Sequence, residues 1–417
     1  MARALAEFAR ALLGASTWRL ALRGLGRQPR RSALVIAAVA TGLAGLVFAM
    51  ALQFGLVLQM AETVVRTEIG DLQAHAHDWR ESAPLERRLP LTPALMALRT
   101  LPVLSGVAPR LRGEALALSP RASVGVRVLG VDAAREPEVS TLAQLVVGGD
   151  WLGPAPRRVV IGEGLARRLR VGLGDKLVLS VQDARGNLTG EAFRVGGLLR
   201  PPTRALDESV VLVRLDEAQR LFGVPGEISE LAFAARDKAA LHEAKAAIAS
   251  ALGPAARVET WRELQPLLVA MIAMFDQVGW VVYAAIFVAM AFGIANALLM
   301  SVFERTREIG VLSALGMPPA RMVAIVVAEA FVMVGVGVAA GFALGFGGVW
   351  LVRDGIDLSA FSEGLRAIGV PTRLVPVVRS GDVWAPVWVA TATALLASLW
   401  PVLRAVRTRP AEALRRI

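Results

Sequence analysis

The chain contains no cysteine in its 417 residues, and only three histidines and one tyrosine. Without thiols it cannot form disulfides, iron–sulfur clusters or thiolate zinc sites. It also has no His-Glu-x-x-His, no Gly-x-Ser-x-Gly and no Gly-x-x-x-x-Gly-Lys-Ser/Thr phosphate loop. These absences exclude the metalloproteases, hydrolases and nucleotide hydrolases that depend on those motifs. We therefore predict no catalytic residue, no metal site and no cofactor bound by this chain.

Charged residues are scarce as well, at 19%, whereas hydrophobic residues make up 55% and the mean hydropathy is +0.54. An ordinary soluble protein is less apolar than this. Crossing a bilayer core takes about 20 apolar residues, and four runs are long enough. We expect transmembrane helices at residues 33–58, 278–303, 322–351 and 384–403. The first run is longer than the apolar part of a signal peptide and no cleavage site follows it, which favours a retained anchor.

The net charge of +11 is concentrated in three segments. Residues 1–31 carry +6, residues 303–321 carry +1 and residues 404–417 carry +4. A four-span topology places all three segments on one side of the membrane, and the positive-inside rule makes that side cytoplasmic. Membrane topology therefore accounts for the arginines, and nucleic-acid binding is not expected. We predict a multi-pass membrane protein with both termini cytoplasmic, and an external domain without disulfides suits the periplasmic side of a bacterial inner (cytoplasmic) membrane.

The segments outside the spans complete this predicted organisation. The N-terminal segment mixes Trp18 and leucines with arginines, as do helices that lie on anionic membrane surfaces. The predicted segments are a cytoplasmic amphipathic helix (1–32), a periplasmic domain (59–277), a cytoplasmic loop (304–321), a periplasmic loop (352–383) and a cytoplasmic tail (404–417).

The periplasmic domain has the pattern of an α+β fold. Helical periodicity and capping residues predict helices at 93–99, 162–170 and 237–252. The fold class is thus an α-helical membrane protein with four transmembrane helices and a large α+β domain between the first two. Apolar runs bounded by turn residues predict strands at 72–76, 106–118, 123–131, 158–161, 176–181, 192–199, 209–213, 230–235 and 257–260.

Two histidines are the candidates for metal ligands. His75 and His77 lie in a predicted strand, where alternate side chains point to the same face. The third histidine, His242, lies far along the chain, and no ligand-rich motif surrounds the pair. We interpret His75 and His77 as a pair of surface histidines, with a metal site as the alternative.

Two further features lie inside the third predicted span. Glu329 is the only strong charge well inside a span, so it should face the bundle interior or a polar partner. We expect a structural ion pair with an arginine of the N-terminal helix, because a proton relay would need further acidic residues in the spans. Gly337, Gly341 and Gly345 recur every four residues on one helix face, a spacing that permits close helix packing.

The stretch from residue 296 to 316 is the most informative in the chain. The second apolar run ends at Phe303, charges replace it at once, and apolar periodicity then resumes up to Gly316. We expect a membrane helix that leaves the bilayer and turns into a short amphipathic helix, an element that a soluble partner can grip. The predicted contact residues are Glu304, Arg305, Thr306, Arg307, Glu308, Ile309, Gly310, Leu315 and Gly316.

These residues resemble the signature of FtsX-like ABC transporter permeases, the family that contains MacB and the lipoprotein-releasing permeases LolC and LolE. The resemblance covers nearly the whole chain, although residues 182–191 form a shorter, proline-free version of the hook in LolC. The matching residues are Asn296, Ser301-Val302, Glu304 to Gly310, Ala314 to Gly316, Glu329-Ala330, Gly130 to Asp132, Gly149 to Leu152, Val160 to Gly162 and Val171 to Asp175 in the periplasmic core, and Pro410 to Arg415 at the end.

The resemblance implies a permease subunit that works by mechanotransmission. Two permease subunits, in a homodimer or heterodimer, would each seat the 304–316 coupling helix on a separate cytoplasmic ABC ATPase, which would bind the ATP. Their movement would extract or export lipoproteins, lipids or amphipathic molecules at the periplasmic side. The periplasmic domain would consist of a porter lobe (62–118 and 231–265) and an inserted sabre lobe (119–230). Membrane lipids and a periplasmic carrier, adaptor or hydrolase complete the expected partners.

Two other functions remain open from the sequence. The same machine would be an FtsX-like transmembrane signalling scaffold if it controlled a periplasmic cell-wall hydrolase instead of moving cargo. A membrane enzyme is the third possibility, and the missing catalytic motifs count against it.

Overall fold

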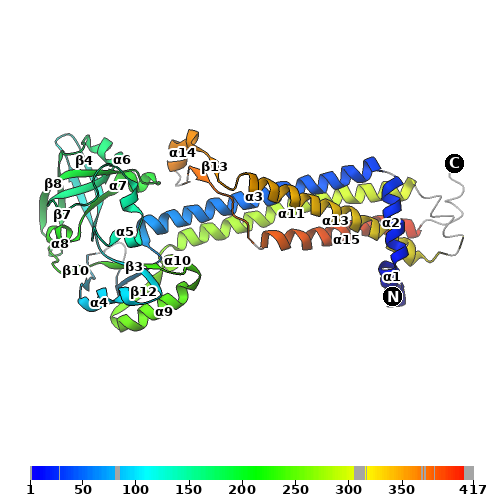
Figure 1. The fold of residues 1–417 in the computed structure, drawn as a ribbon, viewed down its shortest axis with the longest axis horizontal. Helices are drawn as coiled ribbons and strands as arrows, with labels where there is room; N and C mark the ends of the chain where they lie inside the picture. Colours follow the sequence, from blue (N-terminus) through cyan, green and yellow to red (C-terminus); the bar gives the residue numbers. More distant parts are fainter. Residues whose placement is uncertain are drawn as a thin grey trace. The chain divides into compact units, whose positions relative to one another are not determined.

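The computed structural model of the protein describes residues 2–27, 29–79, 85–304, 315, 317–367, 370, 372–379 and 381–407. The chain divides into two compact units. The first unit consists of residues 1–56, 273–356 and 374–417, and the second consists of residues 57–272 and 357–373. The first unit is made of helices, and the second is built on a large mixed sheet (Figure 1).

The helical unit is drawn from α1 (Ala2–Leu13), α2 (Ala15–Arg27), α3 (Pro29–Val64), α11 (Pro266–Glu304), α13 (Pro319–Leu351) and α15 (Gly381–Arg407). All four predicted spans lie within longer helices, because helical structure continues into the flanking residues. Three described helical stretches are long and apolar enough to cross a membrane: Ser32–Ile69, Pro266–Asn296 and Ala320–Leu351. The described apolar part of α15, Val383–Thr393, is shorter.

The N-terminal segment forms two helices, where the sequence predicted one. The break falls at Gly14, and two side chains from the start of α2 cap the carbonyl end of α1. The Thr17 hydroxyl donates to the Ala11 carbonyl at 2.6 Å, and the Trp18 indole N–H donates to the Leu12 carbonyl at 2.8 Å. Side chains that satisfy the free carbonyls of a helix end stabilise its termination there.

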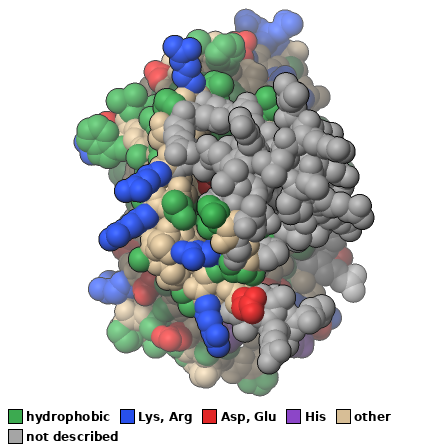
Figure 2. Space-filling model, turned by 90° about the vertical axis from the view of Figure 1, so that its right-hand side faces the viewer, with side chains coloured by type: hydrophobic (Ala, Val, Ile, Leu, Met, Phe, Trp, Pro, Cys, Tyr) green, Lys and Arg blue, Asp and Glu red, His purple; other side chains and the backbone are tan. Residues whose placement is uncertain are grey.

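Both N-terminal helices pack against α13, which holds them at one end of the helical unit. Arg321, near the start of α13, donates a hydrogen bond to the Ser16 hydroxyl at 3.0 Å. Figure 2 shows this end of the unit, with several Lys and Arg side chains on the face turned to the viewer. The positive side chains of this end agree with the concentration of charge in the N-terminal segment.

The second unit contains a ten-stranded sheet with the order β12-β1-β11-β3-β4-β9-β6-β8-β5, in which β7 pairs with β3 and β8. Two short antiparallel pairs, β2 with β10 and β13 with β14, lie outside it. The strands are β1 (Leu72–Ala76), β2 (Leu89–Pro90), β3 (Leu104–Leu118), β4 (Ser123–Val131), β5 (Val146–Gly149), β6 (Arg158–Gly162), β7 (Lys176–Gln182), β8 (Leu188–Leu199), β9 (Val210–Arg214), β10 (Glu227–Ile228), β11 (Glu230–Ala235), β12 (Ala256–Thr260), β13 (Ile356–Asp357) and β14 (Arg373–Leu374).

Short helices connect and cover these strands. The predicted helix at 162–170 is confirmed as α6, and the one at 237–252 is confirmed as a 3₁₀ turn followed by α9. Asp237 accepts a hydrogen bond from the Ala239 backbone N–H at 2.8 Å, as expected of an N-cap residue. The helices of this unit are α4 (Pro93–Ala97), α5 (Glu136–Val139), α6 (Glu163–Leu169), α7 (Arg204–Ser209), α8 (Leu215–Leu221), α9 (Leu241–Leu252), α10 (Trp261–Leu264) and α14 (Ser362–Ala367).

The long strand β3 belongs to both halves of the sheet. Its first part, Leu104 to Arg110, pairs with β11, and its second part, Arg110 to Leu118, pairs with β4. Its last three residues also pair with β7. The segments predicted as porter and sabre lobes therefore contribute strands to one continuous hydrogen-bonded ladder.

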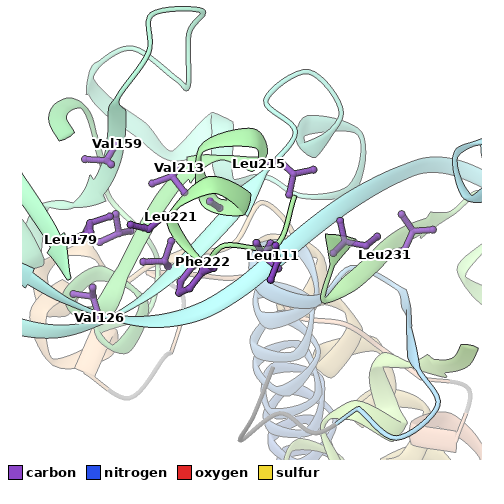
Figure 3. Packing of buried hydrophobic residues seen from close by; sticks show 14 of the residues in the cluster. Leu111, Val126, Val159, Leu179, Val213, Leu215, Leu221, Phe222 and Leu231 are labelled. Atoms are coloured by element: carbon purple, nitrogen blue, oxygen red, sulfur yellow. The ribbon is translucent and has the colours of Figure 1, made fainter. Parts of the chain in front are cut away.

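The largest of the apolar clusters described in the second unit draws on strands from both halves of the sheet. Figure 3 shows Leu111 of β3, Leu179 of β7, Phe222 after α8 and Leu231 of β11 among its members. Phe222 lies directly over Gly113 of β3, where any side chain would collide with the aromatic ring. Burying a large apolar side chain contributes about 1.5–3 kcal/mol, so this cluster stabilises both halves of the sheet together.

Candidate functional site: a polar junction at the end of the first apolar helix

The first apolar helix ends inside the second unit in a turn of π-helix. Residues Val65–Ile69 form this turn, and the Gly70 N–H donates to the Val65 carbonyl at 2.7 Å. Gly70 has a φ of +81°, and a Cβ at this position would lie 3.0 Å from the Phe233 carbonyl oxygen of β11. A glycine is therefore required where the helix meets the sheet. Turns of π-helix occur frequently at functional sites.

Side chains of the sheet bind the backbone carbonyls at this helix end. The Glu68 carbonyl accepts from Arg110 Nη1 at 2.7 Å and from Arg112 Nη2 at 2.9 Å. The Ile69 carbonyl accepts from the Gln73 amide at 2.8 Å. Cationic donors at a helix C-terminus are favoured by the helix dipole as well as by the hydrogen bonds. The helix end is thus attached to β1 and β3 through its own backbone.

The two arginines also belong to a buried ion network. Arg110 makes a bidentate pair with Glu136 of α5, at 3.0 Å for Nε–Oε2 and 2.6 Å for Nη2–Oε1. It also lies 3.4 Å from Glu230, which lies 2.6 Å from Arg112. The side chains of Arg110, Glu136 and Glu230 are fully buried. Arg110 and Glu230 are opposite one another across the β3–β11 ladder, which places unlike charges side by side.

The network favours the charged forms of Arg110 and Glu230. Burial acts to lower the pKa of Arg110, but Glu136 and Glu230 raise it above its ordinary value. Burial acts to raise the pKa of Glu230, but Arg112 and Arg110 hold it below its ordinary value. Charged groups of this kind are stable in a protein interior only as a complete set, because each neutralises its neighbours.

His75 borders this network and is not a surface residue. It is 1% exposed, its ring stacks on Trp79 with 3.8 Å between ring centroids, and its Nδ1 lies 3.3 Å from the Ser229 carbonyl oxygen. His77 lies in the turn after β1 and is exposed. The interpretation as a pair of surface histidines is therefore wrong for His75. Among the described residues no group of three or more His, Asp or Glu side chains could hold a metal ion.

The burial of His75 predicts a pH-dependent stability. Burial lowers the pKa of His75 below 6.5; Glu230 opposes this shift, and Arg112 and Arg257 add to it. The unfolded chain therefore binds this proton more tightly than the folded chain. The contribution of His75 to the free energy of unfolding is fully present above about pH 6.5. It falls as the pH drops below that value, by about 1 kcal/mol over one pH unit.

The measurement is the urea midpoint of the full chain at about pH 7.5 and about pH 5.5, followed by a signal from Trp79. His75→Gln is expected to reduce the difference between the urea midpoints at the two pH values, whereas His77→Gln should leave this difference as in the wild type. An identical pH dependence in His75→Gln would contradict the assignment.

Most of the predicted coupling segment lies outside the described residues. Glu304 is the last residue of α11, and Leu315 is 79% exposed. The structure does not describe the other predicted contact residues, which are Arg305, Thr306, Arg307, Glu308, Ile309, Gly310 and Gly316.

The three glycines of the third predicted span face α3. A Cβ on Gly337 would lie 2.7 Å from Val39 Cγ1, and a Cβ on Gly341 would lie 2.9 Å from Leu43 Cβ. A Cβ on Gly345 would lie 3.0 Å from a Val47 carbon. Side-chain carbons do not approach this closely, so the two helices are packed at a distance that only glycine allows.

Glu329 is buried within α13 at 7% exposure and has an interaction partner. The helical unit brings the N-terminal helices against α13, which is the arrangement that an ion pair to that segment requires. The particular pair with an arginine stays a prediction.

A helical unit with three membrane-length apolar stretches, interrupted after the first of them by an α+β domain, defines a membrane protein with a large extramembrane domain. Two family models match the chain: the MacB-like periplasmic core domain over residues 32–251 and the FtsX-like permease C-terminal model over residues 280–410. The first alone covers more than half of the chain. The chain belongs to the FtsX-like ABC transporter permeases that carry a MacB-like periplasmic core domain.

Similar proteins carry related names. The chain is 24% identical over 404 residues to the lipoprotein-releasing system transmembrane protein LolC of Xylella fastidiosa, covering 91% of this chain and 92% of that protein. It is 23% identical over 365 residues to LolE of Haemophilus influenzae, covering 81% of each. A solved structure of the periplasmic region of MacB from Actinobacillus actinomycetemcomitans has a TM-score of 0.37 and 12% identity, over 50% of this chain and 97% of that one.

Proposed function

We propose that this permease works by mechanotransmission, coupling ATP hydrolysis on a separate ATPase subunit to work done by its periplasmic domain. In this proposal α3, α11, α13 and α15 are four transmembrane helices, both termini are cytoplasmic, and the chain itself has no catalytic role. Two permease subunits pair, and residues 304–316 of each rest on an ATPase subunit that binds ATP. The distribution of the positive charge supports this orientation.

The observation that carries the proposal is the polar junction. Helix α3 and its π-helical end are continuous from Pro29 to Ile69, and the last carbonyls are bound by Arg110, Arg112 and Gln73 of the sheet. A helix attached to a domain through several charge-assisted hydrogen bonds transfers a displacement to it, whereas a flexible linker would absorb that displacement.

We further propose that the cargo is a lipoprotein, a lipid or another amphipathic molecule taken from the periplasmic side of the membrane. Similarity over 91% of the chain to a protein named for lipoprotein release supports this class. Such cargo has an apolar part in the bilayer, so its removal requires work against the hydrophobic effect, about 0.8 kcal/mol per buried CH₂ group. An ATP-driven machine can supply this work.

The test is reconstitution of the permease with a candidate ABC ATPase from the same organism. The triple replacement of Glu304, Arg305 and Glu308 by alanine is expected to abolish ATPase association, or to reduce permease-dependent ATP hydrolysis at least about tenfold. Release of a labelled lipoprotein from proteoliposomes should fall in parallel. A matched control replaces Arg353 and Asp354, two exposed charges of the predicted periplasmic loop. Normal association and coupled hydrolysis in the triple variant would refute the coupling role.

A further inference from the structure

A pocket lies beside the polar junction and shares the residues Glu68 and Arg112 with it. Its cavity volume is about 80 Å³, and it opens to solvent. Its floor is apolar and consists of Leu142, Leu206 and Val210, none of which is more than 5% exposed. Thr67 and Glu68 of the π-helical turn form one wall. An occupant of the pocket would therefore touch the helix end directly.

The mouth of the pocket carries charges that do not balance. Arg127 of β4 is opposite Glu114 of β3 in the ladder and lies 3.7 Å from Glu68. Arg112 is engaged by the buried Glu230 at 2.6 Å. Glu114 is exposed, and among the described residues it has no ion-pair partner. The mouth has two carboxylates and two arginines, and because Glu230 engages Arg112, one carboxylate of the mouth has no cation of its own.

We propose that this pocket binds an amphipathic cation, with an alkyl or similar apolar group on the floor of Leu142, Leu206 and Val210 and an ammonium group beside Glu114. Apolar walls with a few polar groups at the opening are typical of sites for such molecules. An anionic amphiphile would meet Glu114 and Glu68, while both arginines of the mouth are already paired. The pocket thereby selects for positive charge.

This inference deepens the proposed function. The binding of a cation stands by itself, and only the identification of that cation as cargo rests on the proposed function. The occupant contacts Glu68, whose carbonyl Arg110 and Arg112 bind. Binding in the pocket and displacement of α3 consequently act on the same turn. Binding itself needs neither ATP nor the ATPase. A binding measurement therefore tests the pocket, and ATP hydrolysis with the ATPase tests the coupling mechanism separately.

The test is photolabelling of the full chain in lipid nanodiscs, without nucleotide, by a long-chain alkylamine that carries a diazirine. The alcohol of the same chain length is the matched neutral probe, since both partition into the bilayer. In the wild type we expect the amine to label peptides around Leu142 and Leu206 about fivefold more than the alcohol does, as one ion pair at a partly exposed site allows.

Two variants separate the apolar and the charged contributions. Leu206→Trp fills the pocket and should abolish labelling there by either probe, whereas Leu116→Trp, on the exposed part of β3, should not. Glu114→Gln changes an exposed side chain and should reduce labelling by the amine to the level of the alcohol. Equal labelling by both probes in the wild type, or unchanged labelling in Leu206→Trp, would overturn the proposal.

Discussion

Replacing Arg110 with methionine is expected to destabilise the second unit by about 3 to 5 kcal/mol. Methionine keeps much of the side-chain volume but leaves Glu136 without its bidentate partner and Glu230 with only Arg112. The buried carboxylate of Glu136 then lacks its cation, that of Glu230 keeps only one of its two, and the Glu68 carbonyl loses one donor. The measurement is chemical unfolding of the full chain, followed by hydrogen exchange of the sheet amides.

The same network provides the controls. Adding Glu136→Gln to Arg110→Met should restore part of the lost stability, because it removes one uncompensated charge. Arg127→Met breaks the partly exposed pair with Glu68 and should change the stability by less than about 1 kcal/mol. Equal effects of the Arg110 and Arg127 replacements would mean that the buried network does not stabilise the unit.

The replacement Gly341→Leu in α13 is expected to cause the second large loss of stability. A Cβ there would lie 2.9 Å from Leu43 Cβ and 3.0 Å from the Ala40 carbonyl oxygen of α3. Because the second of these atoms is backbone, the two helices would have to separate. We expect a loss of about 3 kcal/mol or more, seen as a lower thermal transition of the detergent-solubilised chain or as its failure to purify as a folded protein.

Gly335 and Gly347 provide matched controls on the same helix. A Cβ at either position would meet nothing within 4 Å. Gly335→Leu and Gly347→Leu should therefore leave the transition temperature unchanged or raise it slightly, because leucine is a better helix former than glycine. If all three leucine variants were equally stable, the close approach of α3 and α13 would not contribute to folding.

The sequence predicts the strands of the second unit well because their patterns are local. The strands at 72–76, 123–131 and 230–235 are confirmed with the same bounds, and β8 differs by starting at Leu188 rather than at residue 192. The difference has a physical cause in the turn from Asp183 to Asn187, where the Asp183 carboxylate accepts from the Asn187 backbone N–H at 2.8 Å. Because of this Asx-type turn, β7 and β8 already pair at Gln182 and Leu188, so their ladder is longer than the sequence predicted.

The polar junction could not be predicted in the same way, because its members are far apart in the sequence. Arg110 and Glu136 are 26 residues apart, and Arg110 and Glu230 are 120 residues apart. One signal was present: Arg110 lies between the apolar residues Pro109 and Leu111 in a predicted strand, and an arginine is unusual at a buried position. His75 gave no such signal, because the burial of β1 on both faces depends on the strands that pair with it.

The division of β3 between two halves of the sheet limits how this domain can change during evolution. If residues 119–230 were removed at the ends of the predicted sabre lobe, the second part of β3 would lose β4 and β7 together. It would then expose an unpaired strand edge, which promotes aggregation. Relatives are therefore not expected to exchange this segment as an independent cassette. Sequence variation should instead accumulate at hairpin tips such as Asp183 to Asn187, where insertions leave the ladder intact.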